Sequence, residues 1–443
     1  MKQGVIDFIT LGCSKNLVDA ERVMRQLEAA GWKCVHDPAE PKGEVCVINT
    51  CGFIGDAKEE SINMILQMAE RKKKGKLRLL IVMGCLSERY RAELEAELPE
   101  VDYYFGKFDF LKLTEKLRIE SVELREVGSC KSFERHLTTP KHYAYVKISE
   151  GCNRMCSYCA IPLITGRHTS RPMDEILQEV KWLVSQGVKE LNVIAQDLSS
   201  YGLDLCKGER KHLLPELIDR MAQIEGVEWI RLHYAYPTDF PEEVLDVMAR
   251  HANVCKYLDI ALQHCTDHML GLMRRHITRA EQDALIKKIR ERVSGICIRT
   301  TLLVGHPGET EEDFEALKSW VREMRFERMG CFAYSDEEGT YANQHYKDDV
   351  PQDVKEHRAS ELMAIQQEIS AELMGQLVGK KERVIIDRED GDYWIGRTQY
   401  DSPEVDCEVL IEKLKVGELK VGEFYDVEII KAEEFDLYGK IIH

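Results

Sequence analysis

Three cysteines in one short segment define the chemistry that this chain could carry out. Cys152, Cys156 and Cys159 have the spacing C-x-x-x-C-x-x-C in the string EGCNRMCSYCAIP. Cysteine thiolates are the usual ligands of iron–sulfur clusters, and a complete set is four. Three thiolates on one loop would therefore leave one iron open to a ligand that is not protein. The spacing predicts a cluster that binds a small molecule.

Zinc is the alternative metal that three close cysteines could bind. Zinc sites favour repeated C-x-x-C pairs or cysteine together with histidine, and this segment has neither pattern. Residues 142–150 alternate between polar and apolar types and are predicted to form a strand that leads into the loop, where Tyr158 directly precedes the third cysteine. We therefore favour an iron–sulfur cluster over zinc.

The first part of the chain, residues 4–121, alternates between short apolar segments and segments with helical periodicity. The predicted strands are residues 4–12, 44–51 and 76–85, and the predicted helices are residues 16–31, 54–75 and 87–100. Such alternation is typical of a doubly wound parallel sheet in an α/β fold.

Cys13, Cys51 and Cys85 follow these three predicted strands. The carboxyl ends of parallel strands line one crevice, so three cysteines far apart in sequence can meet there. Two of them are preceded by glycine and Cys51 is followed by Gly52, which would let the backbone approach a bulky ligand closely. Each cysteine alone could be a small buried side chain. Their equivalent positions favour a second site with three thiolates.

The remaining nine cysteines show no comparable arrangement and are interpreted as core or incidental thiols. They are Cys34, Cys46, Cys130, Cys206, Cys255, Cys265, Cys297, Cys331 and Cys407.

The spacing of the core cysteines, with Tyr158 before the last one, resembles the radical S-adenosylmethionine superfamily. In that family the open iron of a four-iron four-sulfur cluster chelates S-adenosylmethionine, and electron transfer cleaves this cofactor to methionine and a deoxyadenosyl radical. The resemblance implies such a cluster on Cys152, Cys156 and Cys159, S-adenosyl-L-methionine as a cofactor, and an external electron donor. The cofactor carries the hard chemistry, while the protein supplies binding and orientation.

The three N-terminal cysteines, followed by this loop, narrow the resemblance to the methylthiotransferases. Two four-iron four-sulfur clusters are implied, the second on Cys13, Cys51 and Cys85. In that family the radical removes hydrogen from an unactivated carbon of the substrate. The N-terminal cluster presents sulfur, already methylated by a second S-adenosylmethionine, to the carbon radical. No acid–base residue is needed for this step, and none is assigned as catalytic.

Residues 138–370 contain a recurring strand–helix unit. The predicted strands are residues 142–149, 190–197, 228–236, 256–264, 298–305 and 329–335. Six parallel strands with helices between them suggest an open six-unit (β/α) barrel, whose active site lies at the carboxyl ends of the strands. Gln196, Asp197 and His264 are predicted to lie there. We expect His264 to cap its strand or to contact substrate.

The string GHPGET follows one of these strands. Taken alone, Gly305, Gly308 and Glu309 fit an ordinary strand-to-helix turn. In radical S-adenosylmethionine enzymes the equivalent segment contacts the cofactor. The resemblance thus implies that Gly305, Gly308 and Glu309 bind the cofactor, and it implies the same role for four residues outside this loop. Those four are Tyr158, Gln196, Asp197 and Arg275.

The C-terminal segment, residues 376–443, has five predicted short strands and suggests a small antiparallel β-barrel. It resembles the TRAM module, which binds nucleic acid in relatives that modify transfer RNA. This segment holds ten lysines and arginines against seventeen aspartates and glutamates, a net charge of −7. Because RNA-binding surfaces are positively charged, the balance favours a basic protein as the partner, although an uneven distribution could hide a basic patch.

Four strings resemble the RimO-type branch of the methylthiotransferases. They are LGCSKN, IALQHC, GHPGET and YSDEEGT. Enzymes of that branch add a methylthio group to the β-carbon of an aspartate in the twelfth small-subunit ribosomal protein, a very basic protein that the enzyme would meet on the ribosomal subunit. The alternatives are a transfer-RNA adenosine methylthiotransferase and, from another class, an iron–sulfur electron carrier.

The composition sets limits on these interpretations. A length of 443 residues corresponds to three domains at ~150 residues each. The net charge is −17, and no apolar segment approaches the ~20 residues that cross a membrane. Fifteen cysteines without a recognisable export signal predict reduced thiols in the cytoplasm.

Overall fold

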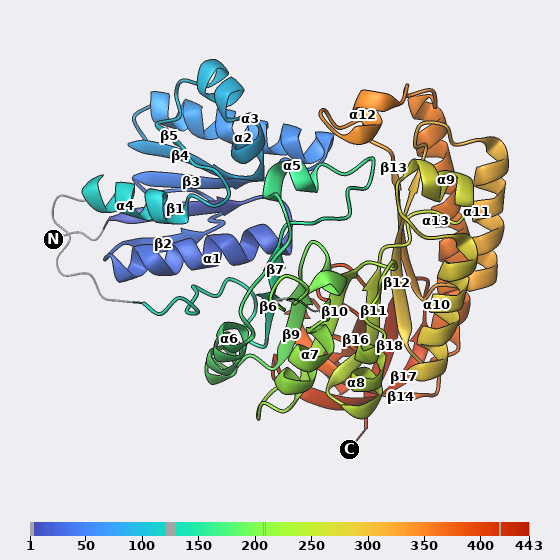
Figure 1. The fold of residues 1–443 in the computed structure, drawn as a ribbon. Coiled ribbons are helices and arrows are strands. Elements are labelled where there is room, and N and C mark those ends of the chain that lie inside the picture. The colour runs from blue at the N-terminus through green and yellow to red at the C-terminus, as the bar shows by residue number, and fades with distance from the viewer. Residues whose placement is uncertain (1–3, 121–129, 207, 209, 416–417, 443) are drawn as a thin grey trace.

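Two parallel sheets and a closed barrel follow one another along the chain in the computed structural model, and a two-stranded sheet of β7 (Ser149–Glu150) and β8 (Thr169–Ser170) lies in the central part (Figure 1). The model describes residues 4–120, 130–206, 208, 210–415 and 418–442. The predicted α/β class and its three parts are confirmed. The boundaries 4–121, 138–370 and 376–443 stay predictions, and residues 121 and 443 lie outside the described residues. No described helix is long and apolar enough to cross a membrane.

The N-terminal sheet has five parallel strands in the order β2-β1-β3-β4-β5. Its elements are β1 (Val5–Thr10), α1 (Ser14–Ala29), β2 (Lys33–His36), β3 (Val45–Thr50), α2 (Gly55–Lys73), β4 (Leu79–Gly84), α3 (Cys85–Glu97), β5 (Tyr103–Tyr104) and α4 (Phe110–Glu120). Separate apolar cores join α1 and α4 to one face, and α2 and α3 to the other. The sequence analysis did not predict β2, β5 and α4, because β2 and β5 are too short to show a strand pattern.

The central sheet has six parallel strands, as predicted, and their order is β13-β12-β11-β10-β9-β6. They are β6 (Tyr143–Lys147), β9 (Glu190–Ile194), β10 (Trp229–Ala235), β11 (Val254–Ile260), β12 (Cys297–Val304) and β13 (Arg328–Ala333). The longer helices are α6 (Met173–Ser185), α7 (Leu214–Ala222), α8 (Glu243–Arg250), α10 (Arg279–Arg292), α11 (Glu311–Met324) and α13 (Gln352–Gly375). The shorter elements are β7 (Ser149–Glu150), α5 (Ile161–Thr165), β8 (Thr169–Ser170), η1 (Leu198–Ser200), α9 (Asp267–Leu272) and α12 (Tyr341–His345).

The two faces of the central sheet differ in polarity. Leu191, Val193, Leu232 and neighbouring apolar residues of the strands pack against the helices in the largest core. The residues between them, which include Asn192 and His233, are buried and polar. Because successive residues of a strand point to opposite faces, these polar side chains line the inside of the open barrel.

The C-terminal strands form a closed barrel in the order β14-β15-β16-β18-β17. They are β14 (Lys381–Asp390), β15 (Tyr393–Arg397), β16 (Glu408–Glu412), β17 (Phe424–Ala432) and β18 (Asp436–Ile441), and η2 (Lys413–Lys415) follows β16. Four of the pairings are antiparallel, but β16 and β18 run parallel. A ring of five strands cannot alternate direction throughout, so one parallel pair is required. The small antiparallel barrel predicted from the sequence is confirmed as a closed barrel, and this one pair departs from the antiparallel pattern.

The connection between β15 and β16 holds the C-terminal barrel against the amino ends of the central strands. Tyr257 donates a hydrogen bond to Asp406 at 2.8 Å, and Arg328 forms an ion pair with Asp401. Arg397 forms a second ion pair, at 2.8 Å, with Glu190, the first residue of β9. The C-terminal barrel therefore covers the end of the central sheet opposite to the carboxyl ends of its strands.

Candidate active site

The three N-terminal cysteines lie where neighbouring strands of the first sheet end. Cys13 precedes the first residue of α1, Cys51 directly follows β3, and Cys85 is both the residue after β4 and the first residue of α3. β1 pairs with β3, and β3 pairs with β4. The chain order changes direction between β1 and β3, which is the position where open α/β sheets bind ligands.

Asn16 connects all three of these strand ends. Its side-chain nitrogen donates hydrogen bonds to the carbonyl oxygens of Leu11 and Thr50, both at 3.1 Å. Its side-chain oxygen lies 3.4 Å from the Cys85 sulfur, and its backbone N–H bonds to the Cys13 carbonyl at 2.9 Å. The sequence analysis missed this residue. The available signal was an asparagine in the first turn of a helix, a position where its side chain readily bonds to nearby backbone.

The glycines beside these cysteines allow protein segments to approach one another. A Cβ atom on Gly12, where φ is +94°, would lie 2.8 Å from the Cys51 Cβ. A Cβ on Gly52 would lie 2.7 Å from the Leu86 backbone nitrogen. The sequence interpretation assigned this space to a ligand. The structure shows that neighbouring cysteine-bearing segments fill it.

The thiols of this triad influence one another electrostatically. Desolvation raises the pKa of Cys85 to about 12, and the charges of Cys13 and Cys51 act in the same direction, while Lys107 lowers it. Removal from water also acts to raise the pKa of Cys13. There, however, the ammonium of Lys15, the backbone N–H groups of Asn16 and Lys15 and the ammonium of Lys107 together outweigh it, and the pKa is lowered.

The core cysteines lie on the loop between β7 and α5. Cys156 is buried, and its sulfur lies 3.4 Å from both the Tyr236 hydroxyl and a guanidinium nitrogen of Arg275. Burial raises the pKa of Cys152 to about 12, and the negative charges of Asp197 and Cys156 contribute. The pKa of Cys159 is also raised, first by burial and then by Cys156.

Arg275 is the main cation beside this loop. Its guanidinium carbon lies 3.9 Å from the centroid of the Tyr236 ring, and one nitrogen lies 3.4 Å from the Tyr158 hydroxyl. Another nitrogen bonds to the Ala261 carbonyl. Its Nε is buried and makes no hydrogen bond within the described residues. The sequence analysis named Arg275 and Tyr158 as cofactor-facing, and the structure places both beside Cys156.

Gln196 and Asp197 follow β9 and reach the same loop. Asp197 accepts hydrogen bonds from Arg154 at 2.7 Å and Ser200 at 2.5 Å through one oxygen, and Gln196 donates to Glu150 at 3.1 Å. The other oxygen of Asp197 and the side-chain oxygen of Gln196 are buried, and neither has a hydrogen-bond partner among the residues that the structure describes. Buried oxygens of this kind usually have a hydrogen-bond partner, so these two oxygens can accept hydrogen bonds from a bound ligand.

The GHPGET loop contacts the cysteine loop through its histidine. His306 lies 2.9 Å from the Ser157 hydroxyl, and burial lowers its pKa to about 4. Glu309 accepts hydrogen bonds from the Gly305 N–H at 2.5 Å and from Arg358 at 2.7 Å. This carboxylate therefore holds the loop in shape. The cofactor contacts that the resemblance implies for Gly305, Gly308 and Glu309 stay a prediction.

His264 and Cys265 are part of the packing. His264 is buried 3.2 Å from Glu309 and bonds to the backbone N–H of Thr266. Cys265 belongs to the central apolar core. These contacts lie at Glu309 and at the start of α9, so the strand cap and the substrate contact expected for His264 stay predictions.

The two cysteine triads lie close to one another. Cys85 packs in one apolar cluster with Ala160, the residue after Cys159, and with Ile164 of α5. This contact joins the first domain to the core at the carboxyl ends of both sheets, beside α5 in Figure 1.

Buried charged residues form a second connection between the triads. Lys107 forms ion pairs with Asp19 at 3.6 Å and with Glu150 at 3.3 Å. Lys147 pairs with the same two carboxylates. Although burial acts to raise it, the pKa of Glu150 falls to about 2, because both lysines favour the charged carboxylate. The sequence analysis did not predict the pairs that Lys107 and Asp19 make, since their members lie far apart in the chain.

The donor set of each triad fits a four-iron cluster. Each supplies three cysteine thiols, and six such thiols carry the ligand chemistry that iron–sulfur clusters use. Across the described ranges, no three His, Cys, Asp or Glu side chains are arranged to hold a single metal ion. Thiolates of a cluster each bind a different iron, so they need not converge on one point.

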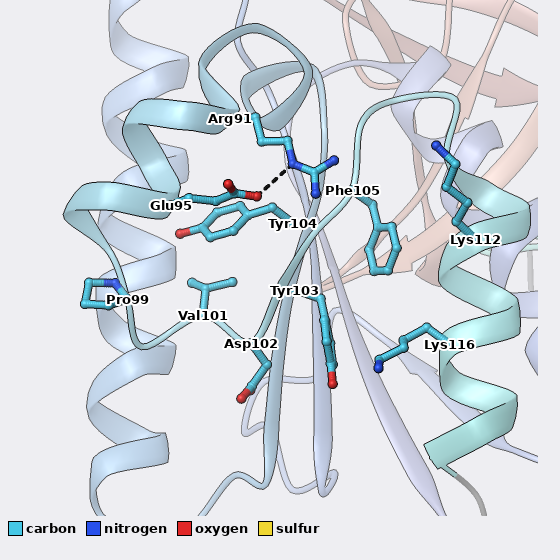
Figure 2. Close-up of a pocket in the computed structure, with 10 residues that line it drawn as sticks. All are labelled: Arg91, Glu95, Pro99, Val101, Asp102, Tyr103, Tyr104, Phe105, Lys112 and Lys116. Atoms are coloured by element: carbon cyan, nitrogen blue, oxygen red, sulfur yellow. Dashed lines mark hydrogen bonds and ion pairs between the residues drawn. The ribbon is translucent and has the colours of Figure 1, made fainter.

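A hollow of about 550 Å³ at the outer edge of the N-terminal sheet lies apart from this chemistry (Figure 2). Tyr103 of β5 and Lys116 of α4 face each other across it, with the ammonium 4.5 Å from the ring centroid. None of the predicted site residues is among those that line it.

Comparison with known proteins gives three family matches. Residues 6–106 match the uncharacterized protein family UPF0004, residues 146–321 match the radical SAM superfamily, and residues 378–442 match the TRAM domain.

Curated relatives match the chain along its length. The chain is 61% identical over 442 residues to the ribosomal protein uS12 methylthiotransferase RimO of Phocaeicola vulgatus, covering 100% of both proteins. It is 55% identical to the RimO of Porphyromonas gingivalis over 100% of both, and 52% identical to that of Flavobacterium johnsoniae over 99% of this chain and 98% of the relative.

Solved structures show the same fold at low identity. The radical S-adenosylmethionine methyltransferase TsrM from Kitasatospora setae aligns with a TM-score of 0.51 and 15% identity over 75% of each chain. The cobalamin-dependent radical enzyme OxsB aligns with a TM-score of 0.53 and 10% identity, over 83% of this chain and 56% of OxsB.

Proposed function

The chain belongs to the RimO family of ribosomal protein uS12 methylthiotransferases, and from this premise we propose that it adds a methylthio group to the β-carbon of an aspartate of uS12. The observation that carries the proposal is the contact between the two triads. Cys85 of one packs against the segment that directly follows Cys159 of the other. A methylthiotransferase needs its radical source and its sulfur source at one substrate carbon.

Two four-iron four-sulfur clusters and S-adenosyl-L-methionine are the cofactors. We assign the first cluster to Cys152, Cys156 and Cys159 and the second to Cys13, Cys51 and Cys85. When bound, these groups supply the reductive cleavage of S-adenosylmethionine and the sulfur that is inserted.

The protein residues beside the core triad bind and orient the cofactor. Arg275 and the Tyr236 hydroxyl lie 3.4 Å from the Cys156 sulfur, so they stabilise negative charge on it. The unpartnered oxygens of Gln196 and Asp197 accept hydrogen bonds from the amino or hydroxyl groups of S-adenosylmethionine. Tyr158 lies beside Arg275 on the same side of the cysteine loop.

The protein partner is basic, and we propose that the C-terminal barrel attracts it. The barrel's net charge of −7 favours encounter with a positively charged protein over RNA. Glu389, Asp390 and Asp392 at one turn of the barrel are exposed. Because the barrel covers the amino ends of the central strands, the part of the partner that it binds would lie at the opposite end of the central sheet from the cysteines. The reaction takes place in the cytoplasm and draws on an external electron donor.

A transfer-RNA adenosine is the second candidate substrate, because the TRAM match covers residues 378–442 and this module resembles RNA-binding modules of the transfer-RNA enzymes. The full-length matches to RimO proteins and the acidic barrel do not favour it.

The test is a direct comparison of the two substrates. Cluster-loaded enzyme is incubated with reductant, S-adenosylmethionine and either purified uS12 or unmodified transfer RNA, and the products are weighed by mass spectrometry. We expect a mass gain of one methylthio group on a uS12 aspartate only. A gain on transfer RNA with none on uS12 would reverse the assignment.

A further inference from the structure

Lys15 is a buried cation at the junction between the N-terminal domain and the core. It lies two residues after Cys13, at the start of α1, and is 8% exposed. Its ammonium lies 3.2 Å from the centroid of the Tyr234 ring, near the carboxyl end of β10. The side chain therefore extends from the N-terminal triad to the opening of the core barrel.

The two other buried lysines at this junction have carboxylate partners. Lys107 and Lys147 both pair with Asp19 and Glu150. Lys15 forms no such ion pair with any residue in the described part of the chain. Burial of a charge is unfavourable unless a counter-charge compensates it, and an aromatic face replaces only part of the lost hydration.

One carboxylate of the core, Asp259 on β11, is already engaged by other groups. Asp259 accepts a hydrogen bond from the Tyr234 N–H at 3.2 Å and pairs with Arg299 at 3.5 Å. His233, beside it, has a pKa well below its usual value because of burial and the cations around it, so it is neutral. The junction thus presents one ammonium that has no carboxylate within ion-pair distance among the described residues.

We propose that Lys15 binds the side-chain carboxylate of the aspartate that the enzyme modifies. The inference rests on the proposed function and specifies how that site recognises its substrate. The reacting β-carbon is bonded to the carboxylate carbon. An ammonium next to Cys13 that holds the carboxylate therefore places the β-carbon on the side of the N-terminal triad, from which sulfur is delivered. The site takes an anionic side chain and discriminates against a neutral isostere.

Equilibrium binding without reductant tests this directly. Cluster-loaded enzyme with S-adenosylmethionine is titrated with uS12 and with a uS12 variant whose target aspartate is changed to asparagine. Removing one partner of a buried charge pair costs at least ~2 kcal/mol, which is about 30-fold in affinity. We expect the wild-type enzyme to bind the asparagine variant about 30-fold more weakly. Lys15→Met should bind both proteins alike, and Lys15→Arg should keep most of the preference.

Lys33→Met is the matched control, because Lys33 lies exposed on β2 of the same domain. It should retain the wild-type preference, and iron content reports whether each variant holds both clusters. Equal binding of the two uS12 forms by the wild-type enzyme overturns the proposal. So does a Lys15→Met enzyme that holds both clusters and still prefers aspartate. Failure of the wild-type enzyme to modify uS12 at all would instead overturn the proposed function.

Discussion

Each of the two cysteine triads contains three thiols, but the two are built in opposite ways. Cys152, Cys156 and Cys159 come from one loop, whereas Cys13, Cys51 and Cys85 come from three strand ends that only the folded sheet brings together. A site on one loop needs that loop to be held in place. A site built from strand ends needs the whole sheet in register, so small changes in packing act on it directly.

The triads also differ in charge. The core triad is surrounded by carboxylates, tyrosines and the guanidinium groups of Arg154 and Arg275, and the pKa of Cys152 is raised to about 12 by burial and by Asp197. In the N-terminal triad, the charges of Lys15 and Lys107 and the backbone N–H groups of Asn16 and Lys15 together outweigh desolvation and lower the pKa of Cys13. We infer that the N-terminal triad favours anions and that the core triad relies on its bound cluster for compensating charge.

Removing each triad separately should produce the largest effects. Changing Cys13, Cys51 and Cys85 to Ala should remove half of the iron and abolish methylthiolation, while cleavage of S-adenosylmethionine to deoxyadenosine continues, because the core triad is intact. Changing Cys152, Cys156 and Cys159 to Ala should abolish both activities. Iron analysis and product chromatography measure these outcomes. Unchanged iron in the first variant would refute the N-terminal cluster, and Cys265→Ala, a core thiol, serves as the control.

Gly52→Ala should damage the N-terminal triad alone. The added Cβ would lie 2.7 Å from the Leu86 nitrogen and 2.8 Å from the Cys85 carbonyl carbon, and backbone cannot move aside easily. Overpacking of this kind costs ~3 kcal/mol at the upper end of its usual range. We expect a lower thermal midpoint and loss of the N-terminal cluster by iron analysis.

The control for this change is Gly271→Ala in α9, where the new Cβ has no neighbour within 4 Å. It should leave both clusters and the midpoint unchanged. A Gly52→Ala protein with full iron and wild-type stability would show that the strand ends tolerate more movement than the structure indicates.

Asn16→Ala should have an intermediate effect on the same triad. It leaves the buried Thr50 carbonyl without its hydrogen bond and removes the contact to the Cys85 sulfur. An unsatisfied buried group costs ~1–3 kcal/mol. Iron should be lost faster on dilution from the N-terminal triad than from the core triad. The exposed Asn63→Ala on α2 is the comparison, and equal rates of iron loss in the two variants would contradict the role of Asn16.

The smallest effect concerns the ion pairs between α1 and the core. Burial acts to raise the pKa of Glu179, but Arg171, Arg135 and Arg22 lower it to about 2. A carboxylate whose pKa is lower in the folded than in the unfolded protein stabilises the fold at pH values above its unfolded pKa. This stabilisation is lost as the pH falls from about 5 towards 2. The thermal midpoint should therefore fall by a few degrees over that interval.

This fall should be smaller in Glu179→Gln, because that variant has lost the titrating group. Glu175→Gln, exposed on the same helix, should follow the wild type. If both variants show the wild-type dependence, the arginines around Glu179 do not link the domains energetically.

Local patterns in the sequence were sufficient for much of the fold. The six central strands and the three longest N-terminal strands were predicted because each is an apolar segment of ordinary length bounded by turn residues. The parallel pairing of β16 with β18 was not predictable from such patterns, since it follows from the closure of an odd-numbered ring.

The candidate site was only partly predictable. All six cysteines and Arg275 were named from spacing and resemblance, and the structure places Arg275 3.4 Å from Cys156. Asn16 was missed because its role depends on the carbonyl groups of two different strand ends. Lys107 and Glu150 were missed because they come from different domains and meet only after these pack together.

The sequence by itself determined that the three cysteines of the core triad lie together, since three cysteines within one loop stay close whatever surrounds them. It also determined the alternation of strands and helices, because hydrophobic periodicity acts over a few residues. Only the tertiary structure decided that Cys85 lies against the segment that follows Cys159 and that Lys15 lies over Tyr234. The physical reason is that such contacts join residues far apart in the chain, and their distances depend on how whole sheets and helices pack.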